Sequence, residues 1–139
     1  LHNPLLKQSV SNGGITTLPG VGYLVATSLV SAIGNGSQFE SGRELAVWLG
    51  LTPRQISSGN KSYMAGITKR GNPYLRKQLV HGARAALHLT KNPDDKVIRW
   101  ARALAVRRGP NKAAVALAAR IARLAWVLMQ RQTAYNPTH

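Results

Sequence analysis

The sequence PNKAAVALAARIARLAWVLMQ at residues 110–130 indicates the fold class most clearly. It begins with a proline, a residue favoured at the first position of a helix. Its large apolar side chains recur three or four residues apart, which places them on one face of an α-helix. That stripe consists of Leu117, Ile121, Leu124 and Leu128. The pattern predicts a long amphipathic helix that buries one face against other elements.

Similar signals predict two helices before this one. Asn72-Pro73 is a capping residue followed by a proline, so a helix should run from residue 73 to about Leu89. Asn92-Pro93 repeats the signal and should open a helix that ends near Arg108-Gly109. The buried stripe of the first of these helices is predicted to be Leu75, Leu79, Ala83, Ala86 and Leu87.

Shorter helices are expected nearer the start of the chain. A helical apolar pattern that includes Leu24 covers residues 24–33. The tetrapeptide SGRE at 41–44 fits a capping box, in which the serine hydroxyl accepts a hydrogen bond from the glutamate amide. A short helix from Leu45 to Leu49, closed by Gly50, should follow. The expected fold is therefore mostly α, a compact multi-helix domain.

The sequence contains no cysteine, which excludes disulfide, zinc-finger and thiol chemistry. No apolar run comes near the roughly 18 residues of a membrane helix, so we expect no membrane contact.

The predicted segments are a lead-in or linker at 1–14, one domain at 15–131 and a tail at 132–139. Within the domain we expect a hairpin-containing part at 15–52, a polar Gly/Ser loop at 53–71 and basic helices at 72–131.

The charge is strongly positive and unevenly distributed. There are 19 Lys and Arg residues against 4 Asp and Glu residues, a formal net charge of +15. Two of the basic residues, Lys7 and Arg43, precede Pro53 and are balanced there by Glu40 and Glu44. All of the net charge therefore lies in the remainder of the chain, which indicates a polyanionic partner such as nucleic acid.

The segment LPGVG at residues 18–22 is a candidate phosphate contact. It resembles the hairpin of a helix-hairpin-helix element. Gly20 and Gly22 would let the backbone approach a phosphate closely, and the amides at the start of the next helix would point at the anion. Such a contact grips the nucleic-acid backbone without reading its sequence. The alternative is an ordinary tight turn before a helix.

The loop at 53–71 brings hydroxyl groups and cations together. Ser57 and Ser58 precede a glycine in this loop. A hydroxyl held among cations can attack a phosphodiester, because the cations stabilise the charge that develops on the phosphate oxygens. The alternative is a loop that contacts phosphate without chemistry. The cations of the loop are Arg54, Lys61, Lys69 and Arg70.

The helix predicted at 73–89 carries Arg76, Lys77 and Arg84, which we also select as nucleic-acid contacts. His81 and His88 lie seven residues apart on one face and are expected to have surface or groove roles. The tryptophans, in apolar helical stretches, are expected in the core. They are Trp48, Trp100 and Trp126.

A metal centre is not expected from these residues. The carboxylates are Glu40, Glu44, Asp94 and Asp95. Glu44 is assigned to the capping box, and the adjacent aspartates would point about 100° apart on a helix. No residue is therefore selected as a metal ligand, and a two-metal nuclease centre is not expected.

An ordered series of motifs resembles a known family. The motifs are LPGVG (18–22), FESGRELA (39–46), WLGLTPRQ (48–55), SSG (57–59), GITKRGNPYLR (66–76) and RGPNKAAVA (108–116). Together they resemble the C-terminal transposase domain of the insertion-sequence 110/116/902 family, in particular its 1111-type subgroup. The resemblance covers about residues 15–130, and the ordered series is far more specific than any single motif.

The resemblance implies a transposase with a mechanism similar to that of serine recombinases. A serine of this domain attacks DNA and forms a covalent phosphoserine link. Ser58, directly before the glycine, matches that serine, and Ser57 is the alternative. The resemblance also implies a structured non-coding bridge RNA as a second partner and a homo-oligomeric full-length protein. A cytoplasmic, nucleoid-associated location follows from these partners.

In that family an N-terminal RNase H-like domain holds divalent metal, expected to be Mg²⁺, with acidic residues. This chain has no counterpart of that domain, so we expect it to bind no cofactor and to be inactive alone. A competing interpretation is a non-catalytic helix-hairpin-helix module that binds DNA or RNA. A ribosomal-type RNA binder would explain the charge but not the motif series.

Overall fold

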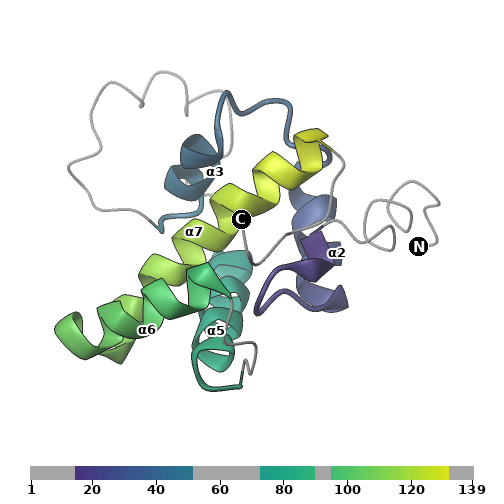
Figure 1. Cartoon of the computed structure of the whole chain (residues 1–139). Helices are drawn as coiled ribbons and strands as arrows, with labels where there is room; N and C mark the ends of the chain where they lie inside the picture. Colours follow the sequence, from purple (N-terminus) through teal and green to yellow (C-terminus); the bar gives the residue numbers. More distant parts are fainter. Residues whose placement is uncertain (1–14, 52–72, 90–94, 132–139) are drawn as a thin grey trace.

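The protein is built from helices in every part that the structure describes. The computed structural model describes residues 15–51, 73–89 and 95–131, and no strand occurs in these ranges. The mostly-α class predicted from the sequence is confirmed (Figure 1). In chain order the elements are the 3-10 turn η1 (Ile15–Thr17), α2 (Tyr23–Ile33), α3 (Gly42–Trp48), α5 (Pro73–Leu89), α6 (Lys96–Arg108) and α7 (Pro110–Arg131).

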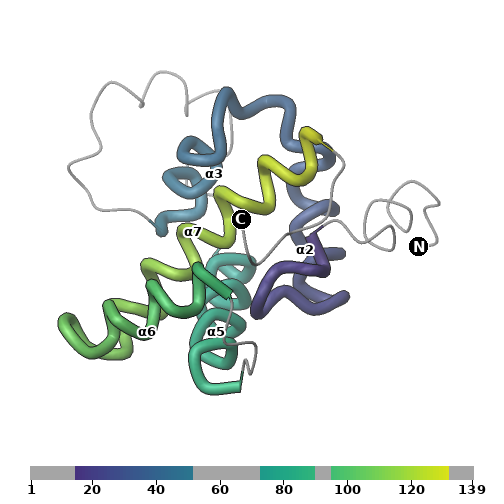
Figure 2. Tube along the Cα trace, in the orientation of Figure 1, coloured from purple at the N-terminus to yellow at the C-terminus, as the bar shows by residue number. Residues whose placement is uncertain are grey.

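Helix α7 lies at the centre of this arrangement. It contacts α3, α5, α6 and η1, and it crosses the molecule diagonally in Figures 1 and 2. Five of the eight buried residues on α7 are alanines, and short side chains allow neighbouring helix axes to approach closely. The buried residues are Ala113, Ala114, Leu117, Ala118, Ile121, Ala122, Ala125 and Leu128. Three residues of the predicted stripe, Leu117, Ile121 and Leu128, are buried as expected. The fourth, Leu124, is only half-buried.

The expectation that no apolar stretch reaches membrane length was wrong for α7. This helix has 22 residues and, by its length and composition alone, is long and apolar enough to cross a membrane. In the fold, its apolar face is occupied by contacts with α3, α5 and α6.

Helix α5 agrees with the prediction in both its bounds and its buried face. It runs from Pro73 to Leu89, and the five residues predicted for its stripe are the five that are buried. At its end, the Arg102 Nε of α6 donates a hydrogen bond to the Leu87 carbonyl over 3.0 Å. Helix α6 is therefore held to α5 as well as to α7.

The helix starts show which capping signals decide the boundaries. The Ser41 hydroxyl accepts from the Glu44 amide over 3.3 Å, as predicted, while the Glu44 carboxylate accepts from the Glu40 amide over 2.7 Å. Helix α6 begins at Lys96 and not at the predicted Asn92-Pro93. Asp95, only 3% exposed, caps it by accepting from the Ile98 amide over 3.0 Å. The carboxylate, a strong cap, sets this boundary.

The predicted apolar stripe of α2 was wrong at Leu24. This side chain is 67% exposed, and the buried residues are Ala26, Leu29 and Ile33. Helix α2 packs mainly on α5 and η1. One narrow face is therefore enough for most of its contacts, and Tyr23 and Leu24, which lie outside that face, are exposed to solvent.

The LPGVG segment forms a tight turn that packs on α5. The Val21 amide donates to the Leu18 carbonyl over 3.1 Å, and Gly20 has φ of 78°, as the third residue of a type II turn requires. A Cβ added to Gly20 would lie 2.5 Å from the Gly82 carbonyl oxygen. A Cβ added to Gly82 would in turn overlap the Gly20 carbonyl oxygen. The paired glycines thus allow the backbone of the turn to touch the backbone of α5.

Replacing Gly82 with alanine should destabilise the protein. In an isolated helix this change stabilises by about 1 kcal/mol, but here the new methyl group meets the Gly20 backbone. We expect a net loss of about 1–3 kcal/mol in the free energy of unfolding, measured by urea denaturation. Gly22→Ala, where a Cβ meets nothing within 4 Å, is the control and should change stability by less than about 1 kcal/mol. A stabilised Gly82→Ala protein would contradict the close contact.

Candidate nucleic-acid interface

The structure describes about half of the site residues that were predicted from the sequence. The two serines and the four loop cations lie outside the described residues, and their roles stay predictions. These residues are Ser57, Ser58, Arg54, Lys61, Lys69 and Arg70. The remaining predicted residues, on the α2 turn and on α5, have defined positions.

The two glycines of the turn have different surroundings. Gly20 lies against Gly82 of α5, and this contact accounts for a glycine at that position without any ligand. Gly22 is the N-cap residue of α2, and open space surrounds the position that its Cβ would occupy. Of the two, Gly22 is therefore the one placed where an anion has free access to the backbone.

Arg76 links the two stretches of chain on either side of residues 52–72, which we call the serine segment. Its Nε donates to the Gly50 carbonyl over 3.1 Å. Gly50 follows Leu49, the C-cap residue of α3, and Arg76 lies in the first turn of α5. The chain therefore leaves α3 and enters α5 at neighbouring points, with residues 52–72 between them. Arg76 is a structural link here, in addition to being a positive charge.

Helix α5 presents a basic face to solvent. Lys77, His81, Arg84 and His88 are spaced by three or four residues, and all four side chains are exposed. One guanidinium nitrogen of Arg84 donates to the Asn111 Oδ1 of α7 over 3.3 Å. The prediction of surface positions for both histidines is confirmed.

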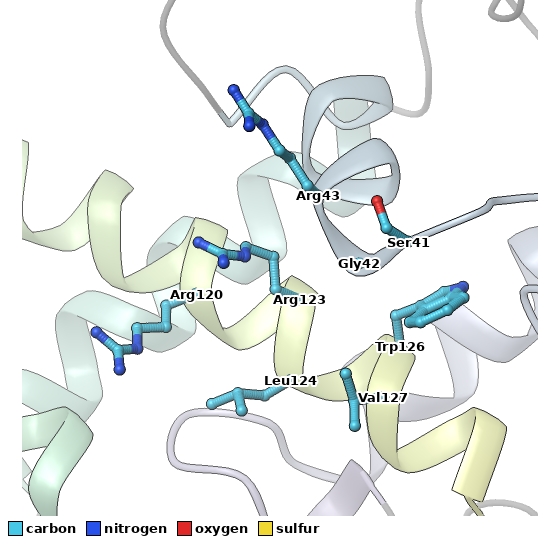
Figure 3. Close-up of a pocket in the computed structure, with 8 residues that line it drawn as sticks. All are labelled: Ser41, Gly42, Arg43, Arg120, Arg123, Leu124, Trp126 and Val127. Atoms are coloured by element: carbon cyan, nitrogen blue, oxygen red, sulfur yellow. The ribbon is translucent and has the colours of Figure 1, made fainter.

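A second basic region, which was not predicted, lies between α3 and α7 (Figure 3). We call it the α3–α7 groove, an open hollow of about 530 Å³. Three of its residues are arginines, and none of the described residues that line it is acidic. The groove is lined by Ser41, Gly42, Arg43, Arg120, Arg123, Leu124, Trp126 and Val127.

Close backbone packing builds this groove. A Cβ added to Gly42 would lie 2.7 Å from the Arg123 carbonyl oxygen and 2.9 Å from its Cα, so the start of α3 rests directly on the α7 backbone. This contact fixes where Arg43 and Arg123 leave their two helices. The third arginine, Arg120, lies over the Trp100 ring of α6, with its guanidinium carbon 4.7 Å from the ring centroid.

Side chains near the end of α7 hold the loop that leads into α3. The Trp126 Nε1 donates to the Gly36 carbonyl over 2.9 Å, and the Gln130 Nε2 donates to the Asn35 carbonyl over 2.6 Å. Trp126 and Trp100 are half-buried and pack against the core, whereas Trp48 is buried beside Phe39. The predicted core positions of the tryptophans are thus confirmed, with two of them at the edge of the core.

The described residues do not offer a metal centre. They contain no group of three or more His, Cys, Asp or Glu side chains that could hold an ion. Asp95, the buried acid, is a helix cap.

Comparison with known proteins accounts for this combination of features. A model of the transposase IS116/IS110/IS902 family matches residues 13–99. The chain belongs to this family. The match contains the LPGVG turn, α3, α5 and the serine segment between them.

Three relatives show the extent of the similarity. The chain is 50% identical over 122 residues to the transposase for insertion sequence element IS1111A of Coxiella burnetii, covering 88% of this chain and 34% of the relative. It is 42% identical over 123 residues to a probable family 20 transposase of Pseudomonas aeruginosa, covering 88% and 36%. It is 35% identical over 122 residues to the transposase for insertion sequence element IS1328 of Yersinia enterocolitica, again covering 88% and 36%. The chain spans about a third of the length of these relatives.

The link made by Arg76 gives a prediction about stability. Arg76→Lys keeps the charge but loses the planar guanidinium whose Nε reaches the Gly50 carbonyl. We expect a loss of about 0.5–1.5 kcal/mol in the free energy of unfolding, measured by urea denaturation. The control is Lys77→Gln, one residue along and exposed, which should stay within about 0.5 kcal/mol of the parent. Equal stability of Arg76→Lys and the parent would show that the charge alone matters.

Proposed function

We propose that this chain is the DNA-binding transposase domain of an insertion-sequence recombinase and supplies its serine nucleophile. Ser58 is the proposed nucleophile, with Ser57 as the alternative. The observation that carries the proposal is the family match at 13–99, because it spans the serine segment in a chain with a net charge of +15. The 50% identity to the IS1111A transposase supports placement in the 1111-type subgroup.

The proposed reaction is a transesterification. The Ser58 oxygen attacks the phosphorus of a phosphodiester, a Ser–O–P bond forms, and a P–O bond to one sugar breaks. The serine proton is given up as the attack proceeds, and the leaving sugar oxygen gains a proton to become a hydroxyl. The covalent intermediate preserves a phosphoester for rejoining the strand. Loop cations stabilise the charge on the phosphate oxygens, and the proposed ones are Arg54, Lys61, Lys69 and Arg70.

The scaffold contributes grip and position to this reaction. Both ends of the serine segment are anchored at one place by the Arg76–Gly50 hydrogen bond. Lys77 and Arg84 on the exposed face of α5, and the open backbone at Gly22, are the proposed contacts to the phosphate backbone. Such contacts orient the nucleic acid without reading its sequence.

Other components of the proposal lie in a longer protein. We propose that divalent metal, expected to be Mg²⁺, is held by an acidic RNase H-like domain, and that this chain alone is inactive. A bridge RNA that joins donor and target DNA, and a homo-oligomeric assembly, complete the proposed system. The proposed location is the cytoplasm, in association with the nucleoid.

A non-catalytic role is the second candidate. The LPGVG turn leads into α2 through the open N-cap Gly22, which is the arrangement that a helix-hairpin-helix module uses to hold a nucleic-acid backbone. In that case the chain would bind DNA or RNA, and Ser58 would do no chemistry. Strand-cleavage chemistry separates the two candidates.

The nucleophile is tested by trapping the covalent intermediate. In a full-length protein that carries this chain, with element DNA and RNA supplied, Ser58→Ala should abolish the protein–DNA adduct and change DNA affinity by less than about twofold, because the loss of one hydroxyl removes little of the binding energy. Adducts are measured on denaturing gels, and mass spectrometry of the peptide spanning residues 55–61 locates them. Ser57→Ala, the matched control, should retain the adduct. Adduct in both single variants would refute the assignment.

The binding mode is tested by its dependence on salt. If the chain neutralises 6–10 phosphates, its affinity for duplex DNA should fall by roughly 10³–10⁵ between 50 and 200 mM salt, because bound counterions are released on binding. Fluorescence anisotropy with a labelled duplex measures this dependence. A flat response would exclude the phosphate backbone as the main source of affinity.

A further inference from the structure

We propose that the α3–α7 groove binds the phosphate backbone of duplex DNA, as a contact surface separate from the serine segment and from α5. The inference rests on the proposed function only in taking DNA as the partner. The residues that carry it are Arg43, Arg120 and Arg123, from two helices that are distant in the sequence.

The charge of the groove fits a polyanion. Its lining includes three guanidinium groups and, among the described residues, no carboxylate. The two acids next to the lining in the sequence are Glu40 and Glu44, and neither of them lines the groove. The Glu44 carboxylate accepts a hydrogen bond from the Glu40 amide. Arginine binds phosphate through paired N–H donors, which makes it the most suitable side chain for such a surface.

The groove is also preorganised. The contact of Gly42 with the Arg123 backbone sets the positions from which Arg43 and Arg123 extend, on the two sides of the groove (Figure 3). Arg120 is held by stacking over Trp100, which leaves the edge of its guanidinium group available for hydrogen bonds. Arginines that are already positioned lose less conformational entropy when they bind phosphate.

The position of the groove favours duplex DNA as the occupant. Helix α3 has seven residues and is therefore about 10 Å long, with the groove at its start and the Gly50–Arg76 link at its end. A duplex that reaches one end of α3 passes the other within about three base pairs, since successive phosphates of a strand advance about 3.4 Å along the axis. Duplex DNA bound in the groove would therefore also pass the point where the chain leaves α3 for residues 52–72.

Matched charge variants test this inference. Arg43→Gln with Arg123→Gln should weaken binding of the chain to a labelled 30-base-pair duplex by about tenfold to hundredfold at 100 mM salt, because two charged contacts are lost. The slope of log affinity against log salt should become shallower by about 1.8. The control, Arg107→Gln with Arg108→Gln, removes the same charge from exposed positions at the end of α6 and should change affinity by less than about threefold.

The outcomes separate the groove from the proposed catalysis. Both double variants should unfold at the same temperature as the parent protein. If the groove variant does not fold, Arg123→Lys with Arg43→Lys replaces it, and this variant should retain DNA binding. Equal losses in the groove and control variants would overturn the proposal. A loss confined to duplex RNA of the same sequence would also overturn it. Because the adduct assay with Ser58→Ala does not depend on these variants, failure of the groove would leave the nucleophile assignment standing.

Discussion

The contact of Gly42 with the backbone of Arg123 is the constraint on which the arrangement of the site depends. Only a residue without a side chain can start α3 this close to α7, because a Cβ at this position would lie 2.7 Å from a carbonyl oxygen. The contact brings Arg43 beside Arg123. It also determines where α3 ends, and so where the chain enters the segment that contains the two serines. One close approach between backbones therefore links the groove to the proposed reaction site.

Helix α7 carries its packing contacts on one face and its exposed arginines, which we propose bind nucleic acid, on another. Its inner face is rich in alanine and lets α3, α5 and α6 pack around one helix. Arg120 and Arg123 lie on its exposed side. The same division holds on α5, where a buried leucine and alanine stripe lies opposite Lys77 and Arg84. The core is thus apolar while cations cover the surface, which suits a small domain that grips a polyanion.

Local sequence signals predicted much of the fold. Helix α5 matched because a proline start and a regular apolar stripe agree there, and the end of α6 matched because Gly109 caps it. The start of α6 was misplaced because Asp95, a residue that the sequence analysis did not consider as a cap, accepts the hydrogen bond from the Ile98 amide that opens the helix. Leu24 was misassigned because periodicity cannot tell how narrow a face the neighbours require. The groove was missed because it depends on a tertiary contact between residues 42 and 123, although exposed arginines opposite the alanine face of α7 were a usable signal.

We propose that particular arginines, and not the net charge alone, hold the nucleic acid. The most direct measurement is an NMR titration of the arginine Nε–H signals of the isotope-labelled chain with duplex DNA. We expect the signals of Arg43, Arg120 and Arg123 to shift together and to saturate at one equivalent of DNA, while those of Arg107 and Arg108 stay nearly unchanged. A uniform small shift of all arginine signals, or unmoved signals for the three groove residues, would contradict it.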